Sequence, residues 1–500
     1  MIAIDSEQRV DVLRQVALLL QKENERLHER LGCLTRELAA AKGVGTEALQ
    51  LELDNLRELL ARRNQEIFGV SSEKRKHVCS DQKEEPKPSG HGRTAQKRLD
   101  VLEEVHVLDE ADRPCPSCGG RLAEMNDQFE ESEEITIVER SFLLKKHRRQ
   151  KYRCQCNGHV ETAPGPVKLM EGGRYSPEFA VAVATSKYLD HLPLERQVRM
   201  MAREGLDVTS QTLWDQLNAV AHRLLPTYQA IRREVLSAPV IGADETHWQL
   251  MGSKEKSRWY AWVAASPDGV FFDIQDSRSE ASAEQVLSGY GGVLMVDGYA
   301  VYSALSRGDP NLVVANCWAH VRRKFVDIQE NFPLACEQML ALIAELYKVE
   351  RSVRECVPRD NAAAFQAALL EARRSRSQAV LDQIQQWVVE QHALPQSGIG
   401  RAIVYMAELW TGLTRFIDDP RIPLDNNATE RAIRGMVVGR KNHYGSRSKR
   451  GTEVAALFYT LIETAKLRGV EPKGYLRTAL MAALNTPGAV TLPEVEPQAA

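Results

Sequence analysis

The chain has 500 residues, a formal net charge of −3 and 43% hydrophobic residues. At roughly 150 residues per domain, this length predicts several folded domains. The net charge excludes a uniformly basic surface but allows local basic patches. No apolar run approaches ~18 residues and the N-terminus has no apolar signal region, so we expect a cytoplasmic protein that does not bind a membrane. Nine cysteines in that compartment indicate metal ligands where they cluster, not a disulfide framework.

Residues 1–68 have the spacing of a helical coiled coil. Mostly leucines recur in steps of three and four from Leu13 to Leu38, Asn24 is a polar position on this seam, and the spacing resumes at Leu49. We predict self-association through this segment, or a helical hairpin, and packing on its own domain is the alternative. Residues 69–100, which are polar and contain Pro and Gly, are expected to form a flexible linker.

Residues 101–170 predict a small zinc-binding β module. A CxxC knuckle followed by two glycines is separated from a later CxC knuckle by β-rich runs, including 141–144. Four thiolates from two knuckles favour one tetrahedral structural Zn²⁺ in a zinc-ribbon-like module. Unrelated reduced cysteines are the alternative, because the second knuckle is shorter than the first. The predicted ligands are Cys115, Cys118, Cys154 and Cys156.

Basic residues crowd the approach to the second knuckle. A run of charged residues usually forms a solvent-exposed surface. On a small zinc-binding module, however, it favours contact with DNA phosphates, which would position the protein on DNA without recognising the base sequence. The residues assigned to this contact are Lys145, Lys146, Arg148 and Arg149.

Residues 171–236 are predicted to be helical. An amphipathic helix over 193–201, a turn containing Gly205, and a second helix that begins at Thr209 and Ser210 give the layout of a helix-turn-helix DNA-binding domain. A plain pair of core helices is the alternative. In the DNA-binding reading, the residues facing a groove are Ser210, Gln211 and Thr212.

Residues 237–330 predict the first part of an RNase H-like α/β core. The order of a three-stranded antiparallel meander, then helix, strand, helix and strand is that of an RNase H-like fold. The expected elements are strands at 240–250, 258–264 and 270–274, a helix at 282–289, strands at 292–296 and 312–315, and a helix from Trp318.

Three acids stand out on these elements. Asp244 lies in an apolar strand, Asp297 ends another, and Glu430 lies in the first turn of a helix that opens with Asp and Asn residues. Two strand-borne aspartates and a helix-borne glutamate are the carboxylate arrangement that holds two divalent cations for phosphodiester chemistry. Since Asp244 and Glu245 must point to opposite faces of their strand, only one of them can join such a site.

Several motifs in the same order carry a family resemblance. They include Asp-Glu-Thr at 244–246, Asp-Gly-Tyr at 297–299, Cys-Trp-Ala-His at 317–320 and Asn-Asn-Ala-Thr-Glu-Arg at 426–431. Over nearly its whole length, the chain resembles the DDE transposases of the insertion-sequence-66 family. The resemblance implies a multidomain α/β protein in which the coiled coil, the zinc module and the helix-turn-helix-like domain precede an RNase H-like core. A helical insertion at 331–420 and a catalytic helix with C-terminal helices at 421–485 then follow.

The same resemblance implies the site and its partners. Asp244, Asp297 and Glu430 would be the catalytic triad and would ligate two Mg²⁺, or Mn²⁺, ions. Cys317 and His320 match a Cys-x-x-His signature of several DDE transposases, for which a structural role is expected over a ligand role. The partners would be double-stranded DNA, as element ends and target, and a second copy of the chain through the coil. Some relatives act beside small accessory proteins. Such enzymes are bacterial and work on the nucleoid.

From Arg431 to residue 451, every Lys, Arg, Asp or Glu position is basic. Beside a metal site for phosphodiesters, these cations favour a DNA backbone clamp over a solvated loop, and they include Arg431, Arg434, Arg440, Lys441 and Arg447. Residues 486–500 are expected to be a disordered tail. Two rival functions remain open, which are a DNA-binding regulator with an inactive catalytic fold and a structure-specific nuclease.

Overall fold

The computed structural model describes residues 105–107, 113, 116–119, 141–153, 155, 159–251, 258–358 and 361–494. The chain divides into two compact units, Phe68–Arg140 and the remainder, and the fold below belongs to the remainder. The predicted coiled coil and linker lie outside the described residues. Within the described residues, none of the helices combines the length and the apolar content needed to cross a membrane.

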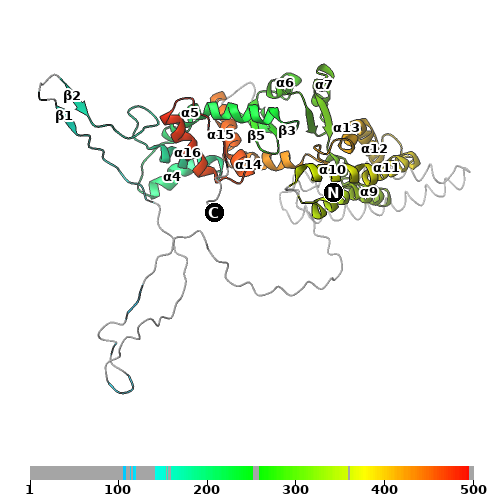
Figure 1. Cartoon of the computed structure of the whole chain (residues 1–500), viewed down its shortest axis with the longest axis horizontal. Coiled ribbons are helices and arrows are strands. Elements are labelled where there is room, and N and C mark those ends of the chain that lie inside the picture. Colours follow the sequence, from blue (N-terminus) through cyan, green and yellow to red (C-terminus); the bar gives the residue numbers. More distant parts are fainter. Residues whose placement is uncertain are drawn as a thin grey trace, which may run out of the picture. The chain divides into compact units, whose positions relative to one another are not determined.

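A mixed five-stranded sheet forms the centre of the α/β fold (Figure 1). The strand order is β5-β4-β3-β6-β7, with the first three strands antiparallel and β6 and β7 parallel to β3. This confirms the predicted meander followed by two further strands. The strands are β3 Val240–Gln249, β4 Arg258–Ala265, β5 Val270–Gln275, β6 Val293–Val296 and β7 Val313–Asn316.

Local chemistry sets the connections of this sheet. The β4–β5 turn is closed by Ser266, whose Oγ accepts the N–H groups of Asp268 and Gly269. Ser279 caps the next helix in the same way, by accepting the N–H of Ser282. The connecting helices are α6 Glu280–Leu287, α7 Ala300–Gly308 and α8 Trp318–Val326.

The sheet shares one large hydrophobic core with most of the helices outside the insertion. Ile241, Ala243 and Leu294 point into this core. At the sheet edge, the hydroxyls of Thr460 and Thr464 accept the free N–H groups of β5, which leaves less of that edge open to other chains. These helices include α3 Pro177–Tyr188, α4 Leu194–Arg203, α5 Ser210–Ser237, α15 Lys449–Leu467 and α16 Pro472–Asn485.

The opposite side chains of the same strands, Val240, Met295 and Ala315, join a second core with α8 and the predicted helical insertion. Residues 333–417 are helical throughout most of their length, as expected. The insertion consists of α9 Pro333–Cys356, α10 Ala362–Ala372, the π-helix η3 Arg373–Ser377, α11 Gln378–Glu390, α12 Gly398–Glu408, α13 Trp410–Thr414 and η4 Arg415–Ile417.

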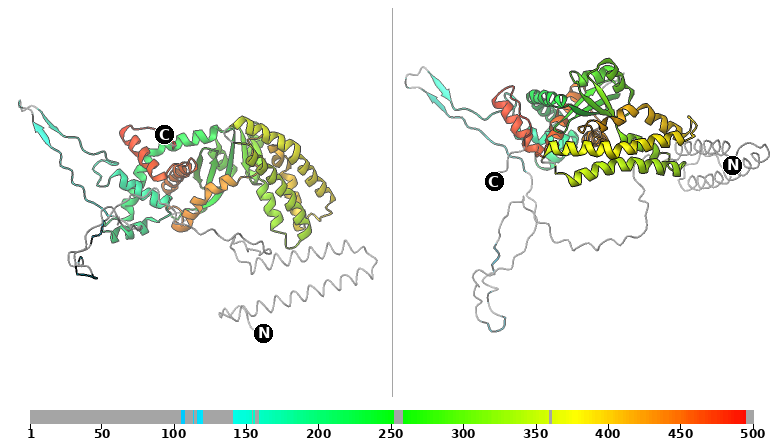
Figure 2. Two further views of the ribbon diagram at one scale, coloured as in Figure 1. Left: turned by 60° about the horizontal axis from the view of Figure 1, so that its bottom comes forward. Right: turned by 45° about the vertical axis from the view of Figure 1, so that its right-hand side comes forward.

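The chain then returns to the sheet as α14, Asn427–His443. Figure 2 shows this helix, in orange, beside the green strands. It ends at Tyr444, which has a left-handed backbone conformation, and α15 follows after a short connection.

Two expectations are corrected by the structure. Residues 141–144 have no regular secondary structure, and the hairpin forms later, from β1 Lys151–Arg153 and β2 Val160–Thr162. The predicted disordered tail begins too early, because the chain stays anchored up to residue 494. The N–H of Thr491 donates to Thr227 and its carbonyl accepts from Tyr475. Leu492 packs on the core, so apolar burial overrides the proline-rich composition.

A buried ion pair fastens the helical insertion. Arg373 is 1% exposed, and its Nε and Nη2 donate to both carboxylate oxygens of Glu350, at 2.7 and 3.1 Å. Its Nη1 donates to the carbonyls of Phe416 and Asp419, on the segment that leads to α14. One guanidinium therefore links α9, η3 and the approach to α14.

Replacing Arg373 with Met should destabilise the protein by up to about 3–5 kcal/mol, because it leaves the buried Glu350 carboxylate with only the longer, half-exposed contact to Arg354, at 3.7 Å. The measurement is the midpoint of urea unfolding. The neighbouring Arg374→Met is a matched control, since its pair with Asp418 is exposed and should contribute only ~0–1 kcal/mol. Equal effects of the two substitutions would contradict the assignment.

Candidate active site

The N-terminus of α14 is held against the sheet by Asn426. This residue is 3% exposed, and its Nδ2 donates to the carbonyl of Ala243 in β3 at 2.8 Å. Its backbone N–H donates to Cys317 Sγ at 3.2 Å, and the N–H of Trp318 donates to the carbonyl of Leu424 at 2.9 Å. The start of α14 is thus bonded to both β3 and α8.

Gly242 makes this close approach possible. A Cβ atom at this position would collide with Asn426 Oδ1 and Thr429 Oγ1, so only glycine lets α14 lie directly on the strand. Side chains alternate along a strand, so Gly242 and Asp244 lie on the same face. The helix that carries Glu430 therefore starts against the face that carries Asp244.

Asp244 occupies an environment that resists its ionisation. Burial is the largest cause that raises its pKa, to about 7, and the negative charges of Glu245, Asp297 and Glu430 raise it further. Among the described residues, no Lys or Arg forms an ion pair with Asp244. Its Oδ1 accepts only the N–H of Glu245, at 2.8 Å. Asp297 and Glu430 thus both act on Asp244 through their charges.

Glu245, unlike Asp244, has a cationic partner in the described part of the chain. Its side chain is 2% exposed, and it accepts hydrogen bonds from Arg278 and, at 2.6 Å, from Tyr302. The Arg278 guanidinium also lies 3.9 Å from the ring centroid of Tyr299. Of the two adjacent acids, Asp244 is therefore the one left available for a cation.

Asp297 follows β6 directly, in a turn that fixes its carboxylate. Its Oδ1 accepts the N–H of Tyr299 at 2.8 Å, and its carbonyl accepts from Asn316 Nδ2 at 2.9 Å. The following residue, Gly298, has Tyr405 of α12 packed where a Cβ would stand. The helical insertion therefore reaches the site through Tyr405, whose ring centroid lies 5.0 Å from Lys324 Nζ.

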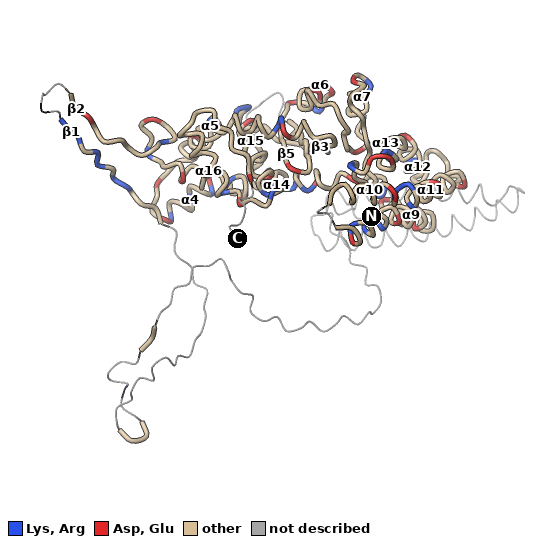
Figure 3. The backbone as a smooth tube through the Cα atoms, in the orientation of Figure 1, with Lys and Arg blue, Asp and Glu red and all other residues tan. Residues whose placement is uncertain are grey.

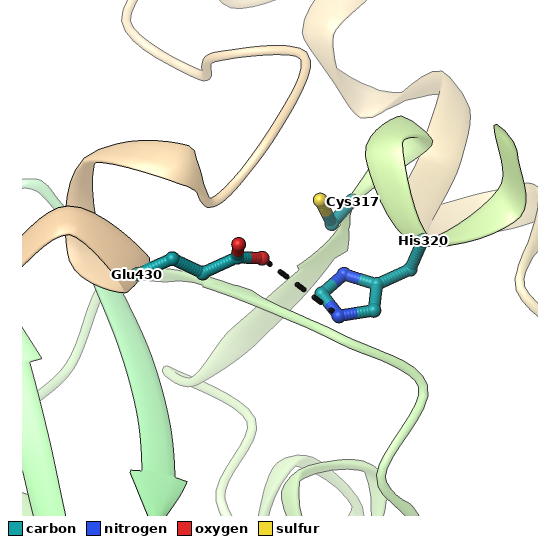
Figure 4. A group of neighbouring side chains, drawn as sticks. All are labelled: Cys317, His320 and Glu430. Carbon is teal, nitrogen blue, oxygen red and sulfur yellow. Dashed lines mark ion pairs between the residues drawn. The ribbon is translucent and has the colours of Figure 1, made fainter. Parts of the chain in front are cut away.

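Glu430 points toward a different group. Its Oε1 lies 3.8 Å from His320 Nε2, and Cys317 lies beside this pair (Figure 4). In the described part of the chain, Cys317, His320 and Glu430 are the one set of three ligating side chains whose donor atoms lie within 4.8 Å of one another. Asp244, Asp297 and Glu430 do not form such a set of three.

Comparison with known proteins identifies the family. The family model described as "Transposase IS66 family" matches residues 172–454, and "zinc-finger binding domain of transposase IS66" matches residues 112–157. The chain belongs to the transposase IS66 family. The zinc-finger match indicates a structural zinc in this transposase. Of its four predicted ligands, only Cys118 lies in the described residues, where it is exposed, and the other three lie outside them.

Relatives in Sinorhizobium fredii (strain NBRC 101917 / NGR234) align over most of the transposase. The uncharacterized protein y4jD is 32% identical over 411 residues, which is 78% of each chain. The uncharacterized protein y4qI is 27% identical over 513 residues, with 94% of this chain and 93% of the relative covered.

The cations predicted to clamp DNA follow one face of α14. Arg431, Arg434 and Lys441 are exposed at helical spacing, and Arg447 is exposed beyond the helix. Arg440 differs, because it is half-buried and its Nη1 donates to Thr246 and to the carbonyl of His247. This arginine ties α14 to β3, and burial lowers its pKa.

The predicted helix-turn-helix residues lie at the start of α5. Thr209 caps the helix by accepting the N–H of Thr212, Gln211 is exposed and bonds Asp215, and Ser210 is half-buried. The same helix continues for 28 residues into the core of the sheet. DNA contact at its start remains a prediction.

The predicted phosphate-contact run leads into β1. Figure 3 shows Lys and Arg in blue along this strand and the residues before it. Lys145, Lys146 and Arg148 are exposed, whereas Arg149 is also exposed but donates its Nε–H to the carbonyl of Ala163 at 2.6 Å.

Sequence reasoning missed the residues that hold the site together. No local sequence pattern marks Gly242 or Tyr405, because each contributes through a contact with a residue more than a hundred positions away. Asn426 was read only as part of a capping turn, but its side chain bonds β3 instead of capping its own helix. For Asn426, the sequence offers one indication of this role, which is an Asn beside an acid at the start of a helix.

Asp244→Asn should stabilise the metal-free protein above pH 7. With a folded pKa of about 7 against an ordinary 3.8, the folded state holds a proton that the unfolded chain has released. Stability is therefore lost as pH rises from 4 to 7. The variant should gain up to ~4 kcal/mol at pH 8 and nothing at pH 4, at ~1.4 kcal/mol per pKa unit.

The measurement is urea unfolding in the presence of a chelator, at both pH values. Asp207→Asn, an exposed acid in the α4–α5 turn, is the matched control and should shift neither. A difference between Asp244→Asn and the natural protein that is the same at pH 4 and pH 8 would refute the raised pKa.

Proposed function

We propose that this transposase binds the ends of an insertion sequence, cleaves the DNA there and joins the freed 3′-hydroxyl ends to target DNA. Its catalytic triad would be Asp244, Asp297 and Glu430. The observation that carries the proposal is the electrostatic setting of Asp244, a buried carboxyl crowded by other acids and left without a cationic partner. A buried carboxyl with a perturbed pKa beside other acids is typical of catalytic sites.

The sheet supports an RNase H-like core. A β5-β4-β3 antiparallel meander, extended by two parallel strands on the far side of β3, is the strand order expected for that fold. In this arrangement Asp244 lies in the central strand, Asp297 directly follows the adjacent strand, and Glu430 comes from a helix that returns to the same face.

The donor set fits divalent cations that prefer oxygen. Three carboxylates provide hard oxygen ligands, and their mutual repulsion would be relieved by two Mg²⁺, or Mn²⁺, ions. When bound, these ions would lower the pKa of an attacking water and stabilise charge on the leaving oxygen. The residues Asp244 and Asp297 would hold them at the strands, and Glu430 would complete the set from α14.

The chemistry is displacement at phosphorus in two stages. Water attacks the phosphodiester at the element end, the bond to the 3′-oxygen breaks, and a 3′-hydroxyl and a 5′-phosphate result. That 3′-hydroxyl then attacks a phosphodiester of target DNA and releases a new 3′-hydroxyl there. The protein would position the element end and the target DNA. The reaction requires no covalent protein–DNA bond.

The positioning surface would include α14 and the basic hairpin. Arg431, Arg434 and Lys441 extend along one exposed face of the helix that begins beside the triad, so a DNA backbone on that face would pass the site. The basic residues before β1 and the start of α5 would add contacts further along the DNA. Self-association through residues 1–68 would bring two ends together in the bacterial cytoplasm, with small accessory proteins as further candidate partners.

Asp244→Asn, Asp297→Asn and Glu430→Gln should each reduce strand cleavage at least ~1,000-fold while leaving binding to end DNA intact, since each removes a metal-ligating charge. Cleavage of end-containing duplex with Mg²⁺ is the assay, and gel-shift titration measures binding. Glu284→Gln, an exposed acid on α6, is the control expected to cleave normally. Full cleavage by any triad variant would remove that residue from the triad.

The α14 surface predicts a change in salt dependence. Arg431→Ala with Arg434→Ala should lower the slope of log K against log salt by roughly 2, at ~0.9 per phosphate contact. The matched control is Lys348→Ala with Arg351→Ala, two exposed cations at the same spacing on α9. An unchanged slope in the α14 variant would exclude this face as a phosphate contact.

A further inference from the structure

A second group of side chains that could ligate a metal ion shares Glu430 with the proposed magnesium site. We propose that Cys317, His320 and Glu430 bind one thiophilic divalent cation, such as Zn²⁺ or Co²⁺, and that its binding withdraws Glu430 from the two aspartates. The inhibitory half of this proposal rests on the proposed function, whereas the binding half does not.

The donor atoms are already gathered. Sγ of Cys317, a ring nitrogen of His320 and a carboxylate oxygen of Glu430 all lie within 4.8 Å of one another (Figure 4). Ligands of tetrahedral Zn²⁺ are roughly 3–4 Å apart, given bond lengths of ~2.0–2.3 Å. His320 and Glu430 are 28% and 36% exposed, so small rotations of these side chains would close the site.

One of the ligands, His320, has a nitrogen left unpaired within the described part of the chain. The buried Nδ1 of His320 has no hydrogen-bond partner among the described residues, which is a costly state that a metal bond would relieve. Its Nε2 has only the 3.8 Å contact with Glu430. Burial raises the pKa of the Cys317 thiol to about 11, and the N–H of Asn426, which Sγ accepts, acts against that shift. A bound cation would stabilise the thiolate directly.

The chemistry of this set separates it from the magnesium ligands. Thiolate and imidazole select zinc-like cations, whereas Mg²⁺ requires oxygen ligands. Three protein ligands leave a fourth position for water, as in open zinc sites. On binding, the Cys317 thiol would release its proton to solvent, with no change in oxidation state.

Glu430 belongs to both sets, so the two sites compete. A cation held by Cys317 and His320 would keep the Glu430 carboxylate on the α8 side, where the structure already places it beside His320. The carboxylates of Asp244 and Asp297 would then lose their third partner. Zinc would therefore inhibit magnesium-dependent cleavage, and excess Mg²⁺ would relieve the inhibition.

The binding test is a Co²⁺ titration of the full-length protein, followed by the thiolate-to-cobalt charge-transfer absorption. The natural protein should bind one more equivalent of Co²⁺ than Cys317→Ser or His320→Ala. Cys356→Ser, which removes an exposed thiol elsewhere, should match the natural protein. Cobalt exchange into the zinc-finger module would be equal in all four proteins. Equal stoichiometry and absorption in all of them would overturn the site.

Circular dichroism of each variant separates loss of the site from loss of fold, and His320→Ala, at a partly exposed position, serves if Cys317→Ser does not fold. The competition test adds Zn²⁺ to cleavage reactions of the natural protein. Inhibition that rising Mg²⁺ reverses would support the shared ligand, whereas bound zinc without inhibition would overturn it. A protein that binds the extra Co²⁺ but never cleaves DNA would contradict the proposed function and leave the metal site standing.

Discussion

The site depends on one buried hydrogen-bonding side chain, Asn426. Its amide bonds the backbone of β3, and its own N–H bonds the sulfur of Cys317, so the start of α14 has one position relative to both β3 and α8. Buried polar groups of this kind specify geometry, because leaving them unpaired costs about 1–3 kcal/mol each. Gly242 permits the contact and Arg440 repeats it further along α14, by bonding Thr246 and His247 in the same strand.

That fixed helix brings like charges together at a cost. Asp244 is crowded by Glu245, Asp297 and Glu430, and among these neighbours only Glu245 has a strong cationic partner, in Arg278. A protein selected for stability alone would not keep a buried carboxyl in this state. A bound cation would relieve this electrostatic repulsion. Functional sites commonly reduce the stability of the folded protein in this way.

Sequence patterns predicted the sheet and the helical insertion well, because those depend on local periodicity. The strand runs of β3 to β7 and the turn at Ser266 are set by neighbours in the chain, and only boundaries shifted, as when α6 began at Glu280 instead of residue 282. The acids were singled out for their places at strand and helix ends, and whether all three act together stays a prediction. The alternating pattern could not reveal that Tyr405 packs on Gly298, or that Thr491 bonds Thr227. Those contacts join residues that no local pattern relates.

The insertion between Asp297 and Glu430 is more than a spacer. It contacts the end of β6 through Tyr405, and Gly412 of α13 packs against Asn316, whose side chain bonds the carbonyl of Asp297. At its other end, Arg373 holds the carbonyls of Phe416 and Asp419, just before the chain reaches Asn426. The same helical body thus supports the turn that carries Asp297 and the segment that delivers Glu430. A displacement of this body would be transmitted to both acids at once, so its packing helps to set their separation.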